Sequence, residues 1–423
     1  MPIVYNGLLK NLSDTTHYST AKPECNTIAT PKPPAFMKIL TYTTLYPNDV
    51  QPRHGIFVEQ RLRHLLAQQA VQAEVIAPVP WFPSKNPRFG AYADYAKVAR
   101  FEQRHNIAIY HPRYLVLPKI GMLITPFLLA AATLPLVKKR LAEGDGFDVI
   151  DAHYFYPDGV AAAIIAKVVN KPLIITARGT DINLIPQYPL PRRMLLWAAR
   201  QAGKIITVCE ALRTEMLQLG VDGDKIHALR NGVDLQVFAP KDRAVCRAEL
   251  DLSQPTLVSV GHLVERKGHH LVIEALQQLP DHHLLIVGDG EELPRLQALV
   301  EKLQLQGRVR FLGALSHQQL ANVYNAADAL VLASSREGWA NVLLEAMACG
   351  TPVVATAIWG TPEVLRTAAA GVLVAERSAA ALAQGVLQLF ASYPNHQETR
   401  RYAEQFSWDD TVAGVYQLLA SVK

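Results

Sequence analysis

The feature that most constrains this chain is an alternation of short β-branched runs with helical stretches, repeated along nearly its whole length. In the first half the strand-like runs are MKILTYTT, AEVIAPV, IAIYHPR, FDVIDAH, KPLIITA and KIITVC. In the second half they are TLVSVG, HHLLIVG, RVRFLG, ALVLAS, PVVATA and GVLVA. Helical patterns such as VEQRLRHLLAQQ and LPRLQALVEKL lie between them. This alternation predicts an α/β chain with parallel sheets covered by helices on both faces.

The strand series occurs twice, and turn residues separate the two series near ALRNGVDLQVFAPKDRAV. We therefore expect two doubly wound, Rossmann-like domains, over residues 37–238 and 239–402, which face each other across a cleft. Segment 403–423 is predicted to be an amphipathic helix that caps the second domain or crosses back to the first. Residues 1–36 are rich in Thr, Ser, Asn, Lys and Pro, and we expect a disordered leader there, with the fold starting at Met37.

Composition excludes several classes of protein. Half of the residues are hydrophobic and 19% are charged, which is an ordinary globular balance. The net charge of +5 suits an anionic membrane surface or bound phosphates, but no basic run interleaved with aromatics indicates nucleic acid. The four cysteines form no C-x-x-C pair, so we expect neither a disulfide framework nor a zinc site, and a reducing, cytoplasmic compartment.

One apolar stretch leaves three alternatives open. Residues 120–137 read IGMLITPFLLAAATLPLV and are followed by Lys138, Lys139 and Arg140. Eighteen uncharged residues reach the lower limit for a spanning helix, although two prolines interrupt them. The stretch is therefore a membrane span, a buried helix of a soluble domain, or a surface element that inserts into an anionic membrane with its basic flank.

The segment SREGWANVLLEAMACGTPVVA reads as loop, helix and strand, and carries two acids in apolar surroundings. Glu337 and Gly338 lie in the loop, and the amides from Gly338 to Val342, including that of Asn341, form a helix N-terminus able to bind phosphate. Glu345 lies further into the helix, where a carboxylate can accept two hydroxyl hydrogen bonds from a ribose. The alternative is a solvated loop acid and an early-helix acid stabilised by the helix dipole.

E-x7-E followed by AMACGTPVVA resembles the retaining family-four glycosyltransferases of the GT-B fold, over most of residues 38–420. The resemblance implies that Glu337 stands against the donor sugar and that Glu345 binds the nucleotide ribose. VGHLVERKGHHLVIEAL is similar to the segment that grips the donor pyrophosphate in that family, which implies this role for Lys267. His262 stands where the family has arginine, and Arg266 can compensate for the weaker cation.

The first half should hold the acceptor. A single glycine, Gly55, replaces the family's double-glycine loop, and its backbone is expected to approach the donor phosphates. His153 ends the strand DVIDAH and is either a cleft residue or a buried histidine bonded to backbone. Arg178 in TARGTD stands where the family often has histidine near the transferred sugar, and it can hold a phosphate or carboxylate but cannot act as a base. Arg178 and His262 together make the chain most similar to the exopolysaccharide and teichuronic-acid-type branch.

The resemblance implies retaining transfer of a sugar from a nucleotide-sugar donor to a hydroxyl of a glycan or lipid-linked acceptor in cell-surface polysaccharide biosynthesis. The donor is a substrate, so no cofactor and no metal are expected. Two alternatives stay open: a nucleotide-sugar epimerase, which shares the architecture, and a catalytically silent nucleotide-sugar-binding subunit. An epimerase would release nucleoside diphosphate without acceptor, and a silent subunit would bind donor and release nothing.

Overall fold

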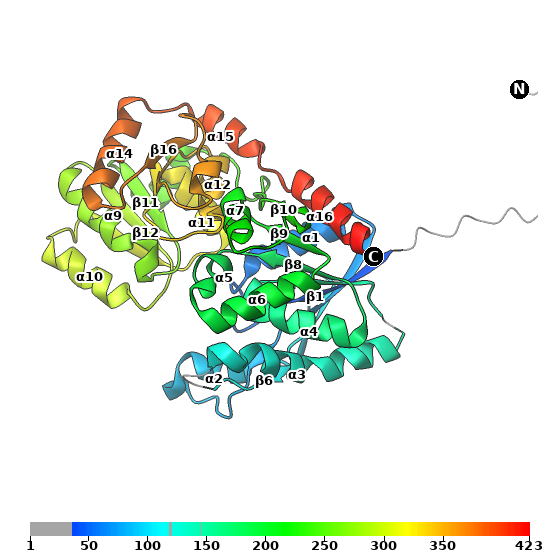
Figure 1. The fold of residues 1–423 in the computed structure, drawn as a ribbon. Helices are drawn as coiled ribbons and strands as arrows, with labels where there is room; N and C mark the ends of the chain where they lie inside the picture. The colour runs from blue at the N-terminus through cyan, green and yellow to red at the C-terminus, as the bar shows by residue number, and fades with distance from the viewer. Residues whose placement is uncertain (1–35, 118–120, 145) are drawn as a thin grey trace, which may run out of the picture. The chain divides into compact units, whose positions relative to one another are not determined.

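Two sheets, one in each half of the chain, organise the protein (Figure 1). The computed structural model describes residues 36–117, 121–144 and 146–423. Of the predicted leader, 1–36, all but Phe36 lies outside the described residues. Residues 36–423 belong to one unit that contains both sheets.

The first sheet has the strand order β10-β9-β8-β7-β1-β2-β5-β4, with β4 antiparallel to β5 and the other neighbours parallel. Its strands are β1 (Met37–Tyr42), β2 (Val71–Ile76), β4 (Phe101–Arg104), β5 (Ile107–Tyr110), β7 (Val149–His153), β8 (Leu173–Ala177), β9 (Lys204–Thr207) and β10 (Ile226–Ala228). The sequence predicted six of these eight strands. It missed both edge strands, because β4 reads FEQR and β10 has only three residues, so neither forms an apolar run. Two short strands, β3 (Val79–Pro80) and β6 (Arg113–Tyr114), pair separately.

The second sheet has the order β13-β12-β11-β14-β15-β16 and is parallel throughout. Its strands are β11 (Thr256–Val260), β12 (His283–Val287), β13 (Val309–Gly313), β14 (Ala329–Leu332), β15 (Val353–Thr356) and β16 (Gly371–Val374). All six correspond to runs predicted from the sequence. The predicted α/β class, with two helix-covered sheets that are parallel apart from β4, is confirmed.

Helices connect the strands and cover the sheets. In the first half they are α1 (Ile56–Gln68), α2 (Ala91–Lys97), α3 (Gly121–Ala142), α4 (Val160–Val169), α5 (Thr180–Asn183), α6 (Pro189–Gln201) and α7 (Glu210–Gln218). In the second half they are α8 (Arg243–Glu249), α9 (His269–Ala275), α10 (Leu293–Lys302), α11 (His317–Ala326), α12 (Asn341–Ala348), α13 (Thr361–Val364), α14 (Ala379–Ala391), α15 (His396–Glu404) and α16 (Trp408–Val422).

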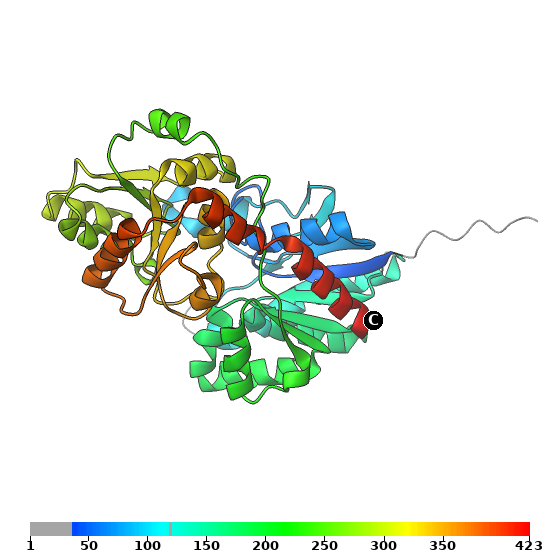
Figure 2. The same ribbon diagram turned by 90° about the horizontal axis from the view of Figure 1, so that it is seen from above.

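Strand β1 shows how the first sheet is buried on both faces. Because successive strand residues point to opposite faces, Ile39 packs with α1 and α16, whereas Leu40 and Tyr42 pack with α3, α4 and α6. Val415 and Leu419 of α16 lie in the same cluster as Ile39, so the C-terminal helix crosses back to the first sheet (Figures 1 and 2). This resolves the two alternatives that the sequence left open for segment 403–423.

Helix α3 contains most of the apolar stretch and includes Pro126 and Pro135. Among the described residues it is the one helix long and apolar enough to cross a membrane, with a mean hydropathy of 1.6 over a window of which 28% is buried. Leu129 and Val137 pack against the core, whereas Phe127 is 53% exposed. The helix therefore buries one stripe and leaves other apolar side chains uncovered.

The packing of α16 predicts a stability effect. Leu419→Ala removes a fully buried side chain and leaves a cavity against the first sheet, which should lower the free energy of unfolding by about 2–5 kcal/mol in urea denaturation. Gln417→Ala, on the exposed side of the same helix, is the control and should change it by no more than about 0.5 kcal/mol. Equal effects of the two substitutions would contradict the docking of α16.

Candidate functional site

The site lies where the loop after β8 meets the loop after β14. The backbones of Gly179 and Gly338 touch, and a Cβ atom added to Gly338 would lie 1.9 Å from the carbonyl oxygen of Arg178. A side chain at Gly338 would therefore push the two loops apart. Since both loops follow the carboxyl ends of parallel strands, the residues expected to bind ligands in each half meet at this contact.

Glu337 lies next to this contact and is only 9% exposed. Its Oε1 accepts hydrogen bonds from the Lys267 ammonium and, at 2.7 Å, from Ser334 Oγ. Burial favours the neutral acid, but the charge of Lys267 and these two hydrogen bonds hold the pKa of Glu337 below its ordinary value. Glu337 is therefore a carboxylate at neutral pH, and Lys267 supplies the counter-charge that its burial requires.

Glu345 lies in the second turn of α12 and is half-buried. The hydroxyl of Tyr324 donates to its Oε2 at 3.1 Å, and no Lys or Arg pairs with it among the residues that the structure describes. Burial raises the pKa of Glu345 to about 7, against the opposing effect of the Tyr324 hydrogen bond. A carboxyl group with a single neutral donor retains the capacity to accept further hydrogen bonds.

A short chain of hydrogen bonds joins the two halves beside Gly338. Nη1 of Arg178 donates to Asn231 Oδ1 at 3.2 Å, and Asn231 Nδ2 donates to Asn341 Oδ1 at 3.3 Å. Asn341 is the first residue of α12, the helix that carries Glu345. The segment between the sheets thus connects Arg178 to the start of that helix.

His153 ends β7 and is buried. Its Nε2 lies 3.1 Å from Asp151 Oδ2, and its Nδ1 is bonded to Nη2 of Arg178. Because a guanidinium can only donate, Nδ1 accepts and the ring proton lies on Nε2, which donates to Asp151. Burial lowers the pKa of His153 to about 4, so the ring is neutral. Its partners are two side chains, so it is neither a free cleft residue nor a histidine bonded to backbone.

The other predicted residues lie in loops around these contacts. Gly55 begins α1 with φ 66°, and a Cβ there would lie 2.3 Å from the carbonyl of Leu45. Arg266 is half-buried, and its Nη1 donates to the carbonyl of Arg336 at 3.4 Å. His262 is exposed, and its side chain makes no hydrogen bond or ion pair with any described residue. Val342, in the first turn of α12, packs partly against the core.

Two family models cover the two halves of this architecture. Residues 60–237 match the model described as Glycosyltransferase Family 4, and residues 243–406 match Glycosyl transferases group 1. The Bacillus subtilis glycosyltransferase TuaC, assigned to teichuronic acid biosynthesis, is 31% identical over 360 residues, 83% of this chain and 88% of its own. The chain belongs to the family-four glycosyltransferases of the GT-B fold. Its likeness to TuaC agrees with the teichuronic-acid-type branch predicted from the sequence.

Solved structures show the same fold. Sucrose-phosphate synthase from Thermosynechococcus elongatus superposes with a TM-score of 0.75 at 21% identity, over 92% of this chain and 99% of that one. HepE of Anabaena, solved in complex with UDP-glucose, superposes with a TM-score of 0.69 at 22% identity, over 91% of this chain and 100% of that one.

Several residues at the site of this glycosyltransferase were missed by the sequence reasoning. Arg61 of α1 is 2% exposed, and its Nη2 donates to Asp151 at 3.4 Å and to Thr176 Oγ1 at 3.1 Å. Burial alone would raise the pKa of Asp151, but His153 and Arg61 hold it at about 2. Asp151 lies in the predicted strand FDVIDAH, and an acid inside an apolar strand indicates a buried carboxylate that needs a partner. The burial of Arg61 was not visible in the sequence, because charged residues surround it in α1.

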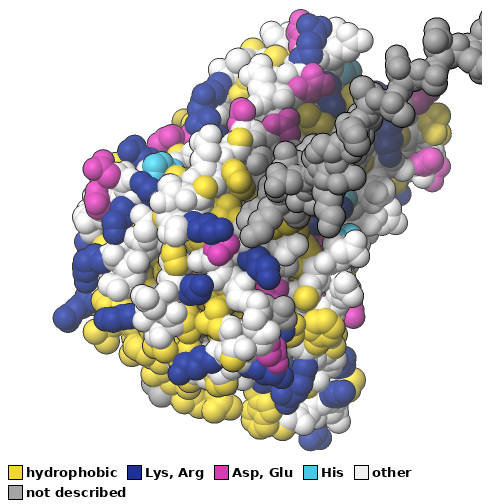
Figure 3. Space-filling view, turned by 90° about the vertical axis from the view of Figure 1, so that its right-hand side faces the viewer, with side chains coloured by type: hydrophobic (Ala, Val, Ile, Leu, Met, Phe, Trp, Pro, Cys, Tyr) yellow, Lys and Arg dark blue, Asp and Glu magenta, His cyan; other side chains and the backbone are white. Residues whose placement is uncertain are grey.

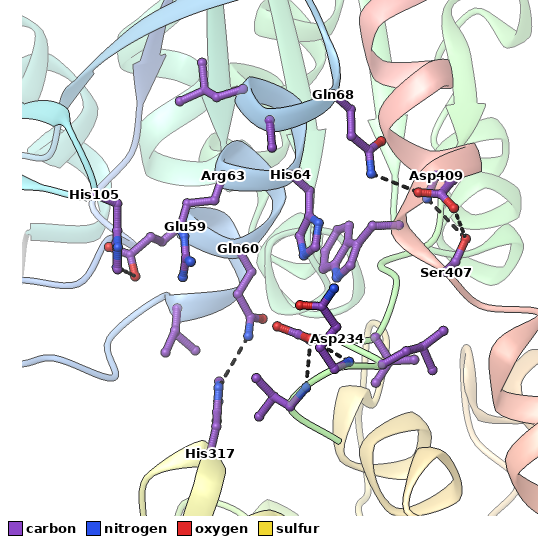
Figure 4. A pocket seen from close by; sticks show the side chains of 18 of the residues that line it. Glu59, Gln60, Arg63, His64, Gln68, His105, Asp234, His317, Ser407 and Asp409 are labelled. Carbon is purple, nitrogen blue, oxygen red and sulfur yellow. Dashed lines mark hydrogen bonds and ion pairs between the residues drawn. The ribbon is translucent and has the colours of Figure 1, made fainter. Parts of the chain in front are cut away.

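A further cavity, of about 1000 Å³, lies on other elements of the glycosyltransferase (Figure 4). It is lined by α1, the turn between β4 and β5, the loop over 233–237, and the first residues of α11 and α16. Gln60 Nε2 lies 3.5 Å from His317 Nδ1, and Gln68 donates to Asp409 at 2.8 Å. None of the site residues predicted from the sequence lines this cavity.

The environment of Glu345 predicts a pH-dependent stability. Its pKa is about 7 in the folded protein and 4.5 ordinarily, so between these values the folded state holds a proton that the unfolded state has lost. The free energy of unfolding therefore falls as the pH rises from about 4.5 to about 7. Glu345→Gln, which cannot ionise, should raise the ligand-free Tm by about 2–4 °C at pH 8 and leave it unchanged at pH 4.5.

Glu376→Gln, at an exposed position, is the control and should leave the Tm unchanged at both pH values. A Glu345→Gln effect of the same size at pH 4.5 and pH 8 would show that Glu345 ionises normally.

Proposed function

We propose that the protein transfers a sugar from a nucleotide-sugar donor to a hydroxyl of a glycan or lipid-linked acceptor, with retention of anomeric configuration and without a metal ion. The observation that carries this proposal is the pair of acids on either side of the start of α12. Glu337 is held ionised by Lys267, and Glu345 keeps unused acceptor capacity.

Each group has a role that its contacts support. An ammonium has three donors, so Lys267 can hold Glu337 and still bind the donor diphosphate together with Arg266. The amides at the start of α12 add donors for the same phosphates. Together these donors stabilise the negative charge that develops on the leaving nucleoside diphosphate. Glu345 accepts the ribose hydroxyls, and Glu337 faces the transferred sugar. The donor phosphate itself takes the acceptor proton, in keeping with a neutral His153 whose two nitrogens are both occupied.

A uracil nucleotide is the first donor to test, because HepE, which shares the fold, was solved with UDP-glucose. The likeness to TuaC supports a role in cell-surface polysaccharide biosynthesis. We place that role in the cytoplasm, at the inner face of the plasma membrane. The cysteines in the described ranges, Cys209, Cys246 and Cys349, are free and buried, which suits a reducing compartment.

The apolar surface around α3 supports a membrane-linked acceptor. Leu123 and Phe127 of α3 border a groove of about 480 Å³ that is completed by residues of α4 and α6, Trp197 among them. Lys138 and Lys139 follow on the same helix. In Figure 3, hydrophobic side chains gather along the lower edge, with Lys and Arg beside them. An apolar surface flanked by cations matches the boundary of an anionic bilayer.

Nucleotide binding tests the proposal. UDP should raise the Tm of the wild type more than GDP or ADP does, by several degrees, and EDTA should not change the shift. Glu345→Ala should abolish most of the shift because the ribose loses its acceptor. Glu376→Ala is the matched control and should retain it. No shift with any nucleotide would contradict the proposed function, and the exposed His262, which replaces the family's arginine, would be the first residue to examine.

Vesicle flotation tests the membrane surface. The wild type should float with vesicles that contain anionic phospholipid and remain unbound with neutral vesicles. Phe127→Ser together with Leu123→Ser should reduce flotation at least about fivefold, because the apolar contact is lost. Leu387→Ser, which alters an exposed leucine of α14 in the second half, is the control. Equal flotation of all variants, or none with the wild type, would contradict this surface.

A further inference from the structure

Arg178 carries a positive charge that no carboxylate of the described chain neutralises by direct contact. Its guanidinium lies 5.0 Å from the ring centre of Phe57, and its two hydrogen-bond partners are His153 Nδ1 and Asn231 Oδ1. Both partners are neutral. Within the ranges that the structure describes, the ion pairs closer than 4.0 Å include none to Arg178.

The nearby acids are already bound to other groups. Asp151 pairs with Arg61 and accepts from His153. Asp181 accepts from the backbone amides of Phe155 at 2.6 Å, of Gly179 at 2.7 Å and of Arg178 itself at 3.0 Å, and none of these bonds involves the guanidinium. Arg61 adds a second positive charge to the same cluster. Asp151 and Asp181 favour the Arg178 charge only through space. Among the residues that the structure describes, this half-buried guanidinium therefore has no counter-ion in direct contact.

The guanidinium also has donors to spare. It carries five N–H bonds, and the contacts to His153 and Asn231 use two, so three have no acceptor among the described residues. One of the three is on Nε, which is buried without a partner. Three free N–H bonds on a planar fork suit a two-pronged contact to a carboxylate or a phosphate.

The position of Arg178 places these donors beside the proposed reaction centre. Arg178 precedes Gly179, and its carbonyl contacts Gly338, the residue after Glu337. Lys267 and Arg266, which hold the donor diphosphate in the proposed function, come from the other half of the chain. Since those two cations already serve the diphosphate, Arg178 is available for a second anionic group.

We propose that Arg178 binds an anionic group, a carboxylate or a phosphate ester, carried by the transferred sugar or by the acceptor. His153 is its positioning residue, since the Asp151 contact keeps the proton on Nε2 and leaves Nδ1 to orient the guanidinium without neutralising it. This inference rests on the proposed glycosyl transfer, and it adds the requirement that a substrate is charged near the reacting carbon.

Binding measurements separate the two sources of the anion. The donor arm compares dissociation constants of UDP, UDP-glucose and UDP-glucuronate by calorimetry, since the two sugars differ only in the carboxylate. The acceptor arm compares glucose with glucose 6-phosphate by ligand-observed NMR, with UDP saturating. If the preceding thermal-shift experiment selects guanine, GDP, GDP-mannose and GDP-mannuronate replace the uracil compounds.

We expect the wild type to bind the anionic probe about tenfold or more tightly than the neutral probe in one of the two arms. That arm identifies whether the donor sugar or the acceptor carries the charge. Arg178→Gln should abolish that preference while leaving the affinity for UDP within about threefold. Arg178→Lys keeps the positive charge but loses the two-pronged guanidinium, so it should retain part of the preference. A partial preference in this variant would show that the loss in Arg178→Gln is not a folding defect. Arg63→Gln, an exposed arginine on α1, is the matched control and should behave as the wild type.

Two results would overturn the inference while leaving the proposed function intact. One is the absence of any anionic preference in both arms when the wild type binds UDP normally. The other is a tenfold loss of UDP affinity in Arg178→Gln, which would mean that Arg178 binds the donor diphosphate. Failure of the wild type to bind UDP, GDP and ADP is a separate result, and it would remove the proposed function and with it this inference.

Discussion

The backbone contact between Gly179 and Gly338 is the constraint on which the rest of the site depends. A side chain at Gly338 would overlap the carbonyl of Arg178, so the two loops can touch only without one. That approach places Arg178 of the first half next to Glu337 of the second. It also lets Asn231, in the segment between the sheets, bond both Arg178 and Asn341. The chemistry of the site is therefore assembled from two loops that are distant in sequence.

Buried charges then hold each loop in place. Asp181 accepts hydrogen bonds from three backbone amides of its own and a neighbouring loop, which fixes the turn that carries Gly179. Lys267 and Ser334 do the same for Glu337 on the other side. Such groups are costly to bury and become acceptable only when partners are supplied. Here the partners belong to the loops that meet in the site, so stability and function use the same contacts.

Much of the architecture could be predicted because its signals are local. Each buried parallel strand is a short apolar run, so all six strands of the second sheet were identified, whereas the polar strand β4 was not. Glu337 was predicted in a loop and Glu345 in the helix that follows, and α12 does begin at Asn341, between the two acids. Lys267 was predicted only as a ligand of the donor pyrophosphate, so its ion pair with Glu337 was not foreseen. The apolar stretch remained ambiguous, because hydropathy cannot tell which faces of α3 the core covers.

The sequence by itself determined the order of the buried strands, the family, and the pair of acids around α12, since each depends on residues close together in the chain. Only the tertiary structure decided what the charged residues contact. Arg61 and Asp151 are ninety residues apart and meet only when α1 packs on the first sheet. The same packing gives His153 two side-chain partners and leaves Arg178 without a carboxylate in direct contact, within the part of the chain that the structure describes. Whether a charged side chain is paired or unpaired depends on its neighbours in space, and these neighbours are set by the tertiary fold.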